Sequence, residues 1–324
     1  MIRIELTADA TARTRFAVSP VYQAVGLLFE LGRRPQLVPR ALRLRSREVI
    51  QDRGLWLLAA LTVSPHGYTP DFLTPEPTAY SSPVDDELHR VASVAAERVR
   101  DEMAVVSHGL DVSRVPARGA QRVVLEALGA GEDRFAQLLA GQLDAFWRGV
   151  LAPSWGEISE RLERDVDQRA GATARLGLGG MIGGLDPLLD WQDGALAVNS
   201  EYHVDYQAPG IILIPGAFLT SPTFSIDTTY TDTPRTPVIT YPTAARPEGP
   251  HDLGELIGGS RAAILKALSK PRTTAEVARH VHLSASTVSY HLQVLHRAGL
   301  LQRVQRSRHV FYQVRAAGQS PLRS

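Results

Sequence analysis

Residues Leu283–Val314 read LSASTVSYHLQVLHRAGLLQRVQRSRHVFYQV, and the prediction of the fold starts from this stretch. Ser284 is a residue type that caps helix N-termini, and Gly299 is typical of the residue just after a helix. A helix is therefore predicted over Ala285–Ala298. Its apolar residues recur at helical spacing, so one face is expected to be buried.

The two faces of this predicted helix differ in chemistry. At about 100° per residue, Val288, Leu292 and Leu295 form the inward stripe, with His291 at its margin. The opposite face carries hydroxyl, phenol, amide and guanidinium groups and no acid. Such groups hydrogen-bond phosphates and base edges, whereas an ordinary solvated face more often pairs Glu with Lys. The polar residues of this face and its flanks are Ser286, Thr287, Ser289, Tyr290, Gln293 and Arg297.

The neighbouring segments complete a known order of elements. Upstream, a helix is predicted over Ser260–Leu268, and Thr273 with Glu276 forms a capping box that opens a second helix, which ends at a turn around His282 and Leu283. Downstream, two strands, Leu301–Gln305 and His309–Val314, are joined at Arg306-Ser307-Arg308. Helix, helix, turn, helix and hairpin together predict a winged helix, with Arg303, Arg306 and Arg308 on the wing.

This part of the chain resembles the ArsR/SmtB-type bacterial transcriptional regulators, whose pattern is close to L-S-x-S-T-V-S-x-H-L-x-x-L-x-x-A-G-L followed by R-x-G-R-x-x-Y-Y. The upstream string GGSRAAILKALSKPRTTAEVA is similar to theirs as well. The N-terminal strings TARTRF and PDFLTP resemble a longer actinobacterial-type subgroup. The resemblance implies a DNA-binding homodimer. The residues at pattern positions are Ser284, Ser286, Val288, Ser289, His291, Leu292, Leu295, Ala298 and Gly299.

The chain departs from this family in three respects. Metal-sensing members use cysteines on the first helix of the motif, or His and carboxylates after the wing; this chain has no cysteine, and no His follows Val314. Metal sensing is therefore not expected, and neither a metal nor a cofactor is predicted. The helix that normally follows the wing and helps to form the dimer is missing from the pattern. Ser307 replaces the usual glycine at the wing tip, which favours a longer loop over a two-residue turn.

Charge divides the chain in two. The chain has 324 residues and a formal net charge of +1. Residues 251–324 carry eleven basic and three acidic residues, a net charge of +8, which leaves −7 for residues 1–250. A proline- and threonine-rich stretch, Pro215–Pro250, precedes the basic part. We therefore predict a domain over residues 1–248 and a basic one over 249–324, which is expected to meet a polyanion.

The N-terminal domain is predicted to be α+β and mostly helical. Ile2–Leu6 alternates as a strand does, and Ser19-Pro20 begins a helix. Further helices are expected over Arg53–Leu61, Asp85–Val106, Arg118–Leu128, Glu132–Leu151 and Trp155–Arg175. Strands are expected over Ala195–Val198, Tyr202–Tyr206, Ile211–Ile214 and Val238–Tyr241.

No catalytic motif stands out in this domain. The glycine run Gly177–Gly184 has Ile182 where a dinucleotide loop needs its third glycine, so a helix break is the better interpretation. Helically spaced aromatics are more often core than the lining of an effector pocket. The aromatics in question are Phe135, Phe146, Trp147 and Trp155. The apolar stretches are too short to span a bilayer, and no secretory signal is recognisable, so a cytoplasmic protein is expected.

The sequence thus favours a non-enzymatic, sequence-specific transcriptional regulator that binds double-stranded DNA as a homodimer. Ser286, Tyr290 and Gln293 are predicted to read bases, and Ser289 lies beside them. The N-terminal domain would dimerise and bind an unknown effector. The alternative is an enzyme or ligand-binding body whose winged helix docks to a protein. The residues predicted to contact phosphates are Ser284, Thr287, Arg297, Arg303, Arg306 and Arg308.

Overall fold

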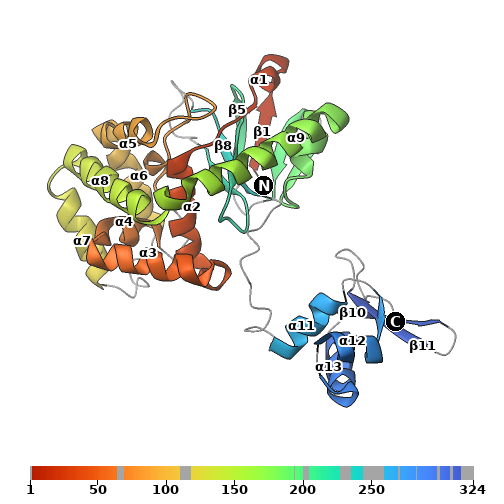
Figure 1. Ribbon diagram of the computed structural model, residues 1–324. Helices are drawn as coiled ribbons and strands as arrows, with labels where there is room; N and C mark the ends of the chain where they lie inside the picture. Colours follow the sequence, from red (N-terminus) through yellow and green to blue (C-terminus); the bar gives the residue numbers. More distant parts are fainter. Residues whose placement is uncertain are drawn as a thin grey trace. The chain divides into compact units, whose positions relative to one another are not determined.

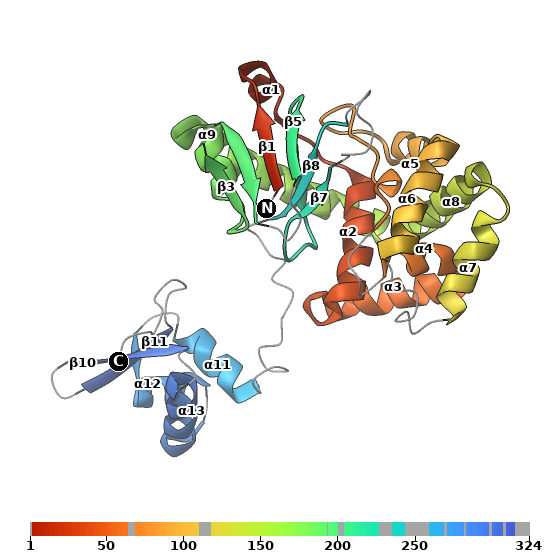
Figure 2. The ribbon, with the colours of Figure 1, turned by 180° about the vertical axis from the view of Figure 1, so that it is seen from behind.

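The chain forms two compact units, Met1–Pro247 and Glu248–Ser324, here called the N-terminal and the C-terminal unit. The boundary expected near Glu248 lies outside the residues that the structure describes. The computed structural model (Figures 1 and 2) describes residues 2–63, 69–109, 118–192, 194–199, 204–226, 235–243, 259–268, 271–281, 283–297, 300–306 and 309–314.

The N-terminal unit combines a helical part with a part built from strands, as the α+β prediction required. Among its described residues the first helices are α1 (Ala8–Ala12), α2 (Pro20–Arg33), α3 (Arg40–Asp52) and α4 (Trp56–Thr62). They are followed by α5 (Val84–Ala92), α6 (Ala96–Gly109), α7 (Arg118–Leu128), α8 (Glu132–Val150) and α9 (Trp155–Gly183). Short 3₁₀ helices cover Pro35–Leu37, Asp71–Leu73 and Ala152–Ser154.

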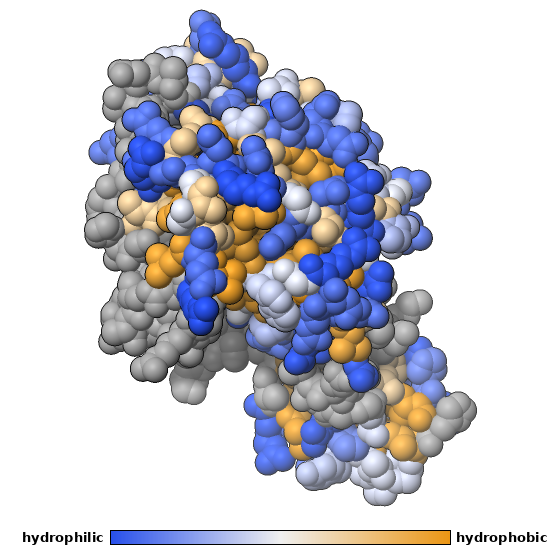
Figure 3. All heavy atoms as spheres, turned by 90° about the vertical axis from the view of Figure 1, so that its left-hand side faces the viewer, coloured by the Kyte–Doolittle hydropathy of each residue, from blue (hydrophilic) through white to orange (hydrophobic). Residues whose placement is uncertain are grey.

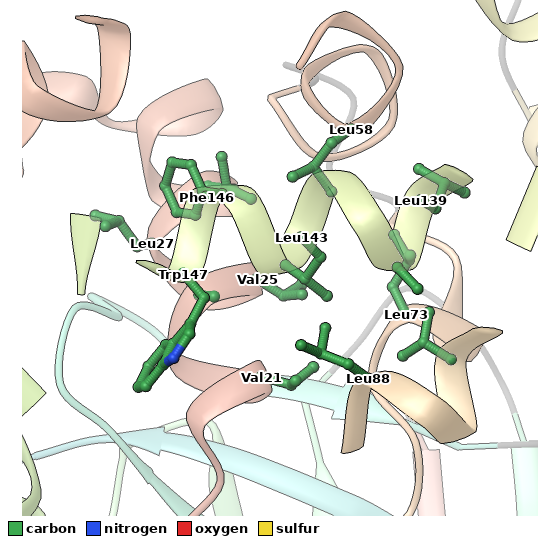
Figure 4. Close-up of a cluster of buried hydrophobic side chains, with 14 of the residues drawn as sticks. Val21, Val25, Leu27, Leu58, Leu73, Leu88, Leu139, Leu143, Phe146 and Trp147 are labelled. Carbon is green, nitrogen blue, oxygen red and sulfur yellow. The ribbon is translucent and has the colours of Figure 1, made fainter. Parts of the chain in front are cut away.

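Helix α8 lies at the centre of the helical part. It contacts α2, α3, α4, α5, α6 and α7. Its Phe135, Leu139, Leu143 and Phe146 are completely buried. Figure 4 shows Leu139, Leu143 and Phe146 among side chains from the surrounding helices. On the face seen in Figure 3, hydrophobic residues gather in patches that hydrophilic residues border.

The four aromatic residues considered as a pocket lining belong to this core. Phe135 packs against Phe72 with ring centroids 6.5 Å apart, and Trp147 meets the edge of Trp155 at 4.9 Å. Phe146 is also part of the core cluster, and Trp155 packs against it. Core packing, the more common interpretation, is therefore confirmed.

The strands of the N-terminal unit form two four-stranded sheets. In the first, β1 (Ile2–Leu6) runs antiparallel to β4 (Ala195–Val198) and parallel to β5 (Val204–Ala208). Strand β3 (Leu189–Gln192) pairs with β4 at the edge. Ile4 is completely buried and lies opposite both Leu196 and Tyr206. The first strand of the unit therefore pairs with strands formed by residues much later in the sequence of the same unit.

The second sheet has the order β2-β6-β8-β7. Its strands are β2 (Arg15–Phe16), β6 (Ile212–Gly216), β7 (Thr223–Ser225) and β8 (Val238–Pro242). Strand β6 is parallel to β2 and β8, and β7 is antiparallel to β8. Strands β6 and β8 are almost entirely buried, as is typical of parallel strands covered on both faces.

Helix α9 covers both sheets and contains the glycine run. Gly177 has φ +73°, a left-handed conformation that interrupts the helix, so the predicted break is confirmed. The helix then resumes to Gly183 and buries Met181 and Ile182. A side chain at Gly179 would lie 2.3 Å from the Trp191 ring, so glycine allows this close approach of helix and strand.

Several expected element bounds are wrong. The single helix over Asp85–Val106 is two, because α5 ends at Ala92 and the Ser93 N–H closes its last turn. The helix expected from Arg53 begins at Trp56, because Gly54 adopts φ +64°. Helix α3 was not predicted at all. Its many arginines obscure the helical periodicity, and only two of its residues, Ser46 and Val49, are buried. The strand expected to end at Tyr206 continues to Ala208, and its expected start at Tyr202 lies outside the described residues.

The C-terminal unit contains three helices and three strands among its described residues. The helices are α11 (Gly259–Ala267), α12 (Thr274–Val281) and α13 (Ala285–Arg297). The strands are β9 (Arg272–Thr273), β10 (Leu301–Arg306) and β11 (His309–Val314), in the order β10-β11-β9. No helix among the described residues of the chain is long and apolar enough to cross a membrane.

Candidate nucleic-acid interface

The capping box at the start of α12 is present. The Thr273 N–H donates to the Glu276 carboxylate at 2.8 Å, and the Thr273 hydroxyl donates to the same oxygen at 2.9 Å. These hydrogen bonds, the backbone one first, hold the pKa of Glu276 below its ordinary value. Thr273 also lies opposite Phe311 in the β9–β11 pair. One residue therefore begins the helix and joins it to the sheet.

The turn before α13 leads into a cluster of hydroxyl groups. The Thr287 N–H donates to the Ser284 hydroxyl oxygen at 3.1 Å, which confirms Ser284 as the N-cap. The Ser284 Oγ also lies 2.9 Å from Ser286 Oγ and 2.8 Å from Thr287 Oγ1. His282, expected in the turn, lies outside the described residues. Three hydroxyls thus surround a helix N-terminus, where the backbone dipole favours anions.

The inner side of α13 is buried as the spacing predicted. Val288 and Leu292 are completely buried, and Leu295 is 2% exposed. They pack in one apolar cluster with Ile264, Leu268, Val277 and Leu301. This core fixes the rotation of α13 about its own axis, and so determines which side chains point to solvent.

The outer face of α13, defined here as Ser286, Tyr290, Gln293 and Arg297, is exposed to solvent. Tyr290 exposes 57% of its surface, an unusual fraction for a large aromatic residue. Its ring meets the His291 ring edge-on at 5.5 Å, which holds it on the surface of the helix. Thr287 and Ser289 are half-buried at the flanks. The structure therefore brings all seven predicted residues from Ser284 to Arg297 onto one helix.

The histidines of this unit do not form a metal site in the part of the chain that is described. His291 is half-buried, and its Nδ1 atom has no hydrogen-bond partner there. His280 and His296 are exposed. Across the described residues, no group of three or more His, Cys, Asp or Glu side chains is arranged to hold a metal ion.

Strands β10 and β11 pair along their whole length. Arg303 lies opposite Tyr312, and Arg306 lies opposite His309, so Ser307 and Arg308 are the whole connection. The longer loop expected from Ser307 is therefore wrong, because the ladder of paired residues sets the register up to the last residue of each strand. The Arg303 side chain is exposed. The Arg306 side chain and all of Arg308 lie outside the described residues.

Among the described residues of this unit, exposed basic groups outnumber exposed acidic ones. Arg279, Arg297 and Arg303 are exposed. The described acid, Glu276, is engaged at the start of α12 and not on the outer face of α13. An exposed helix face that offers donors and acceptors without a carboxylate, in a unit with further exposed arginines, suits an anionic polymer with hydrogen-bonding groups.

Comparison with known protein families matches residues 259–304 to the family described as a helix-turn-helix domain. The match spans α11, α12 and α13 and the start of β10. No curated protein and no solved structure matches the chain. The C-terminal unit is therefore a helix-turn-helix domain that follows a larger N-terminal body.

Proposed function

We propose that this helix-turn-helix domain is a winged helix of the ArsR/SmtB type and that the protein is a cytoplasmic transcriptional regulator which recognises a specific sequence in double-stranded DNA. The observation that carries the proposal is the outer face of α13, which is exposed, polar and free of acids above a completely apolar inner stripe. Helices that read DNA need such a face, because base edges and phosphates demand hydrogen-bonding groups without negative charge.

In this proposal α13 enters the major groove. Ser286, Tyr290 and Gln293 read base edges, and Ser289 lies beside them on the flank. A Gln side chain suits adenine, to which it can both donate and accept a hydrogen bond. The hydroxyl cluster of Ser284 and Thr287 faces a phosphate at the helix N-terminus, where the observed N-cap already exposes it. Arg297, one turn beyond Gln293, adds a second phosphate contact.

The β10–β11 pair acts as the wing. Arg303, exposed on β10, contacts the phosphate backbone, together with Arg306 and Arg308 at the tip. Support comes from the pairing of β11 with β9, which ties the strands to the two residues just before α12. A wing held in this way keeps a fixed direction relative to α13.

The N-terminal unit, residues 1–248 in the proposal, provides a homodimer interface and binds an effector; it has no catalytic role, metal or cofactor. Two recognition helices then reach half-sites about 34 Å apart on the duplex. The net charge of −7 on residues 1–250 keeps this part of the chain away from the DNA.

The test begins with selection of duplexes from a random-sequence library by the purified full-length protein, followed by footprinting. We expect one enriched sequence with two related half-sites. Enrichment of no sequence over a scrambled duplex, at low and at physiological salt, would overturn the proposal and favour a protein-docking role.

Variants then separate the residues that are proposed to read bases from those that are proposed to contact phosphates. Gln293→Ala is expected to relax the preference at one base position by about 1–3 kcal/mol. Arg303→Ala is expected to weaken binding to every duplex and to lower the salt slope by about 0.9. Arg122→Ala, an exposed arginine of the N-terminal unit, is the matched control and should change neither quantity.

A further inference from the structure

The N-terminal unit contains a cavity that the proposed DNA-binding residues do not explain. It has a volume of about 340 Å³ and lies between α2, the Asp71–Leu73 3₁₀ helix and strands β7 and β8. Val25, Leu219 and Phe224 give it apolar walls. A cavity of this size and lining is typical of sites for small organic molecules.

Asp71 lies in the wall of this cavity and in that of a second, smaller one. Part of its surface remains accessible, although burial raises the pKa of its carboxyl group to about 6. Ser225 lines the same cavity, and its side chain lowers the pKa of this carboxylate and so partly offsets the effect of burial. The position therefore has the two properties of a ligand-binding acid: it is shielded from bulk water, and it can be reached from the cavity.

The nearest guanidinium, that of Arg235, donates its hydrogen bonds to other groups, although its charge lowers the pKa of the Asp71 carboxyl and partly offsets the effect of burial. Arg235 is 7% exposed and donates to the Asp71 backbone carbonyl at 3.2 Å, to the Tyr22 hydroxyl at 2.9 Å and to the Thr74 carbonyl. Within the described part of the chain, no salt bridge joins a basic side chain to the Asp71 carboxylate. A carboxylate that is largely shielded from water and has no direct ion pair is costly, so a cation supplied from the cavity would be bound favourably.

Aromatic rings line the same cavity. Tyr22, Phe29 and Phe224 contribute to its walls, and ring faces attract organic cations. Arg33 lies over the Phe29 ring, 5.1 Å from its centroid, at an exposed position of the lining. Because this guanidinium repels a second cation there, a cationic ligand is expected to place its charge deeper, at Asp71.

From this arrangement we infer that the cavity binds an organic cation, a primary amine with an apolar body. The ammonium group hydrogen-bonds to the Asp71 carboxylate, and the body lies among Val25, Leu219 and Phe224. This inference goes beyond the proposed function and does not depend on it, because binding to the N-terminal unit can be measured without DNA.

The test uses three probes that share one body and differ in charge: 4-phenylbutylamine, 4-phenyl-1-butanol and 4-phenylbutyrate. Each is titrated into the full-length protein by calorimetry at pH 7.5, without DNA. We expect the amine to bind at least about tenfold more tightly than the alcohol and the carboxylate to bind weakest, because charge-assisted hydrogen bonds are the stronger ones.

Two variants assign the site. Asp71→Asn keeps the shape of the side chain and removes its charge, so it should remove the preference for the amine over the alcohol. The matched control, Asp52→Asn, changes an exposed acid at the end of α3 and should leave the preference unchanged. Gly26→Leu fills the cavity from α2, where a Cβ atom would only touch Leu219 at 3.5 Å, and should abolish binding of all three probes.

The pH dependence provides a further check. Between pH 7.5 and pH 5 we expect amine binding to weaken about tenfold, because protons compete for the carboxylate. The charged groups facing Asp71 are Arg235, Arg98 and Glu102, with Arg33 on the cavity lining. The inference is overturned if the carboxylate probe binds as tightly as the amine, if Asp71→Asn keeps the preference, or if no probe binds at 10 mM, on the order of the weakest specific affinities.

Discussion

In the C-terminal unit the described core consists only of apolar side chains, whereas the N-terminal unit encloses acids, an arginine and a glutamine within its interior. Glu30, Glu87 and Asp165 are at most 4% exposed. The C-terminal unit instead presents its polar groups on the outer face of α13. This difference teaches where each unit can place polar chemistry: the C-terminal unit on the surface of a helix, the N-terminal unit also in its interior.

The buried polar groups of the N-terminal unit are mostly structural. Gln23 of α2 donates to the Pro215 carbonyl at 2.9 Å and accepts from the Ala217 N–H at 2.8 Å. Glu30, two turns later, accepts from the N–H and the hydroxyl of Thr220, both at 2.8 Å. These bonds satisfy backbone groups where the chain leaves β6, and so fix that segment against α2.

The largest effect is expected from a substitution in the apolar core of the C-terminal unit. Leu292→Ala removes a completely buried side chain and should destabilise this unit by about 2–5 kcal/mol. Hydrogen exchange of the full-length protein should show lost protection in α11, α12 and α13 and unchanged protection in α8. Ser286→Ala, on the outer face, is the control. Equal loss of protection in both units would show that their stabilities are not separate.

The next prediction concerns Glu87, one of the buried acids of the N-terminal unit. Glu87 accepts hydrogen bonds from Ser19 and the Val21 N–H at the start of α2, yet burial raises its pKa to about 7. Because its unfolded pKa is near 4.5, the folded protein holds more protons between these values, and stability falls as pH rises through about 4.5–7. Glu87→Gln should reduce this fall and add about 1–3 kcal/mol at pH 8.

Urea unfolding at pH 5 and pH 8 measures this difference. Glu97→Gln, which changes an exposed acid on α6, should follow the wild-type pH dependence. If Glu87→Gln instead lowers stability at pH 8 by more than at pH 5, the carboxylate is stabilised by its two donors more than it is penalised by burial.

A smaller effect is expected at the capping box of the C-terminal unit, where the pKa of an acid, Glu276, is lowered and not raised as it is for Glu87. Thr273→Ala removes the donor and cap shared with Glu276 and should cost about 0.5–2 kcal/mol. Since these bonds lower the pKa of Glu276, their contribution is present at neutral pH and is lost as the acid is protonated. Hydrogen exchange in α12 at pH 7 reports the loss, and Thr274→Ala, the next residue, serves as control. A loss that does not diminish at acidic pH would argue against Glu276 as the partner.

The smallest effect on stability is expected on the outer face of α13. Gln293→Ala and Tyr290→Ala should each change the free energy of unfolding by no more than about 0.5 kcal/mol, because both side chains are exposed. Chemical denaturation of the full-length protein measures this. A large loss would mean that these residues serve the fold and would remove the reason to assign them to a partner.

The sequence predicted the C-terminal unit in detail because local signals specify it. The Thr273–Glu276 box, the Ser284 cap and the spacing of Val288, Leu292 and Leu295 all act within a few residues. The one error, a longer loop at Ser307, came from judging the turn apart from the pairing of its strands. Helices α7 and α8 were predicted almost to the residue for the same reason of local periodicity.

The sequence by itself thus determined the two-part charge distribution, the α+β class and the side of α13 that faces solvent, since composition and periodicity are properties of neighbouring residues. Only the tertiary structure decided that β1 pairs with β4 and β5, that Asp71 and Tyr22 meet Phe224 around one cavity, and that Arg235 donates to the Tyr22 hydroxyl. Those contacts join residues far apart in the chain, and their geometry depends on the packing of the whole N-terminal unit, which no local pattern encodes.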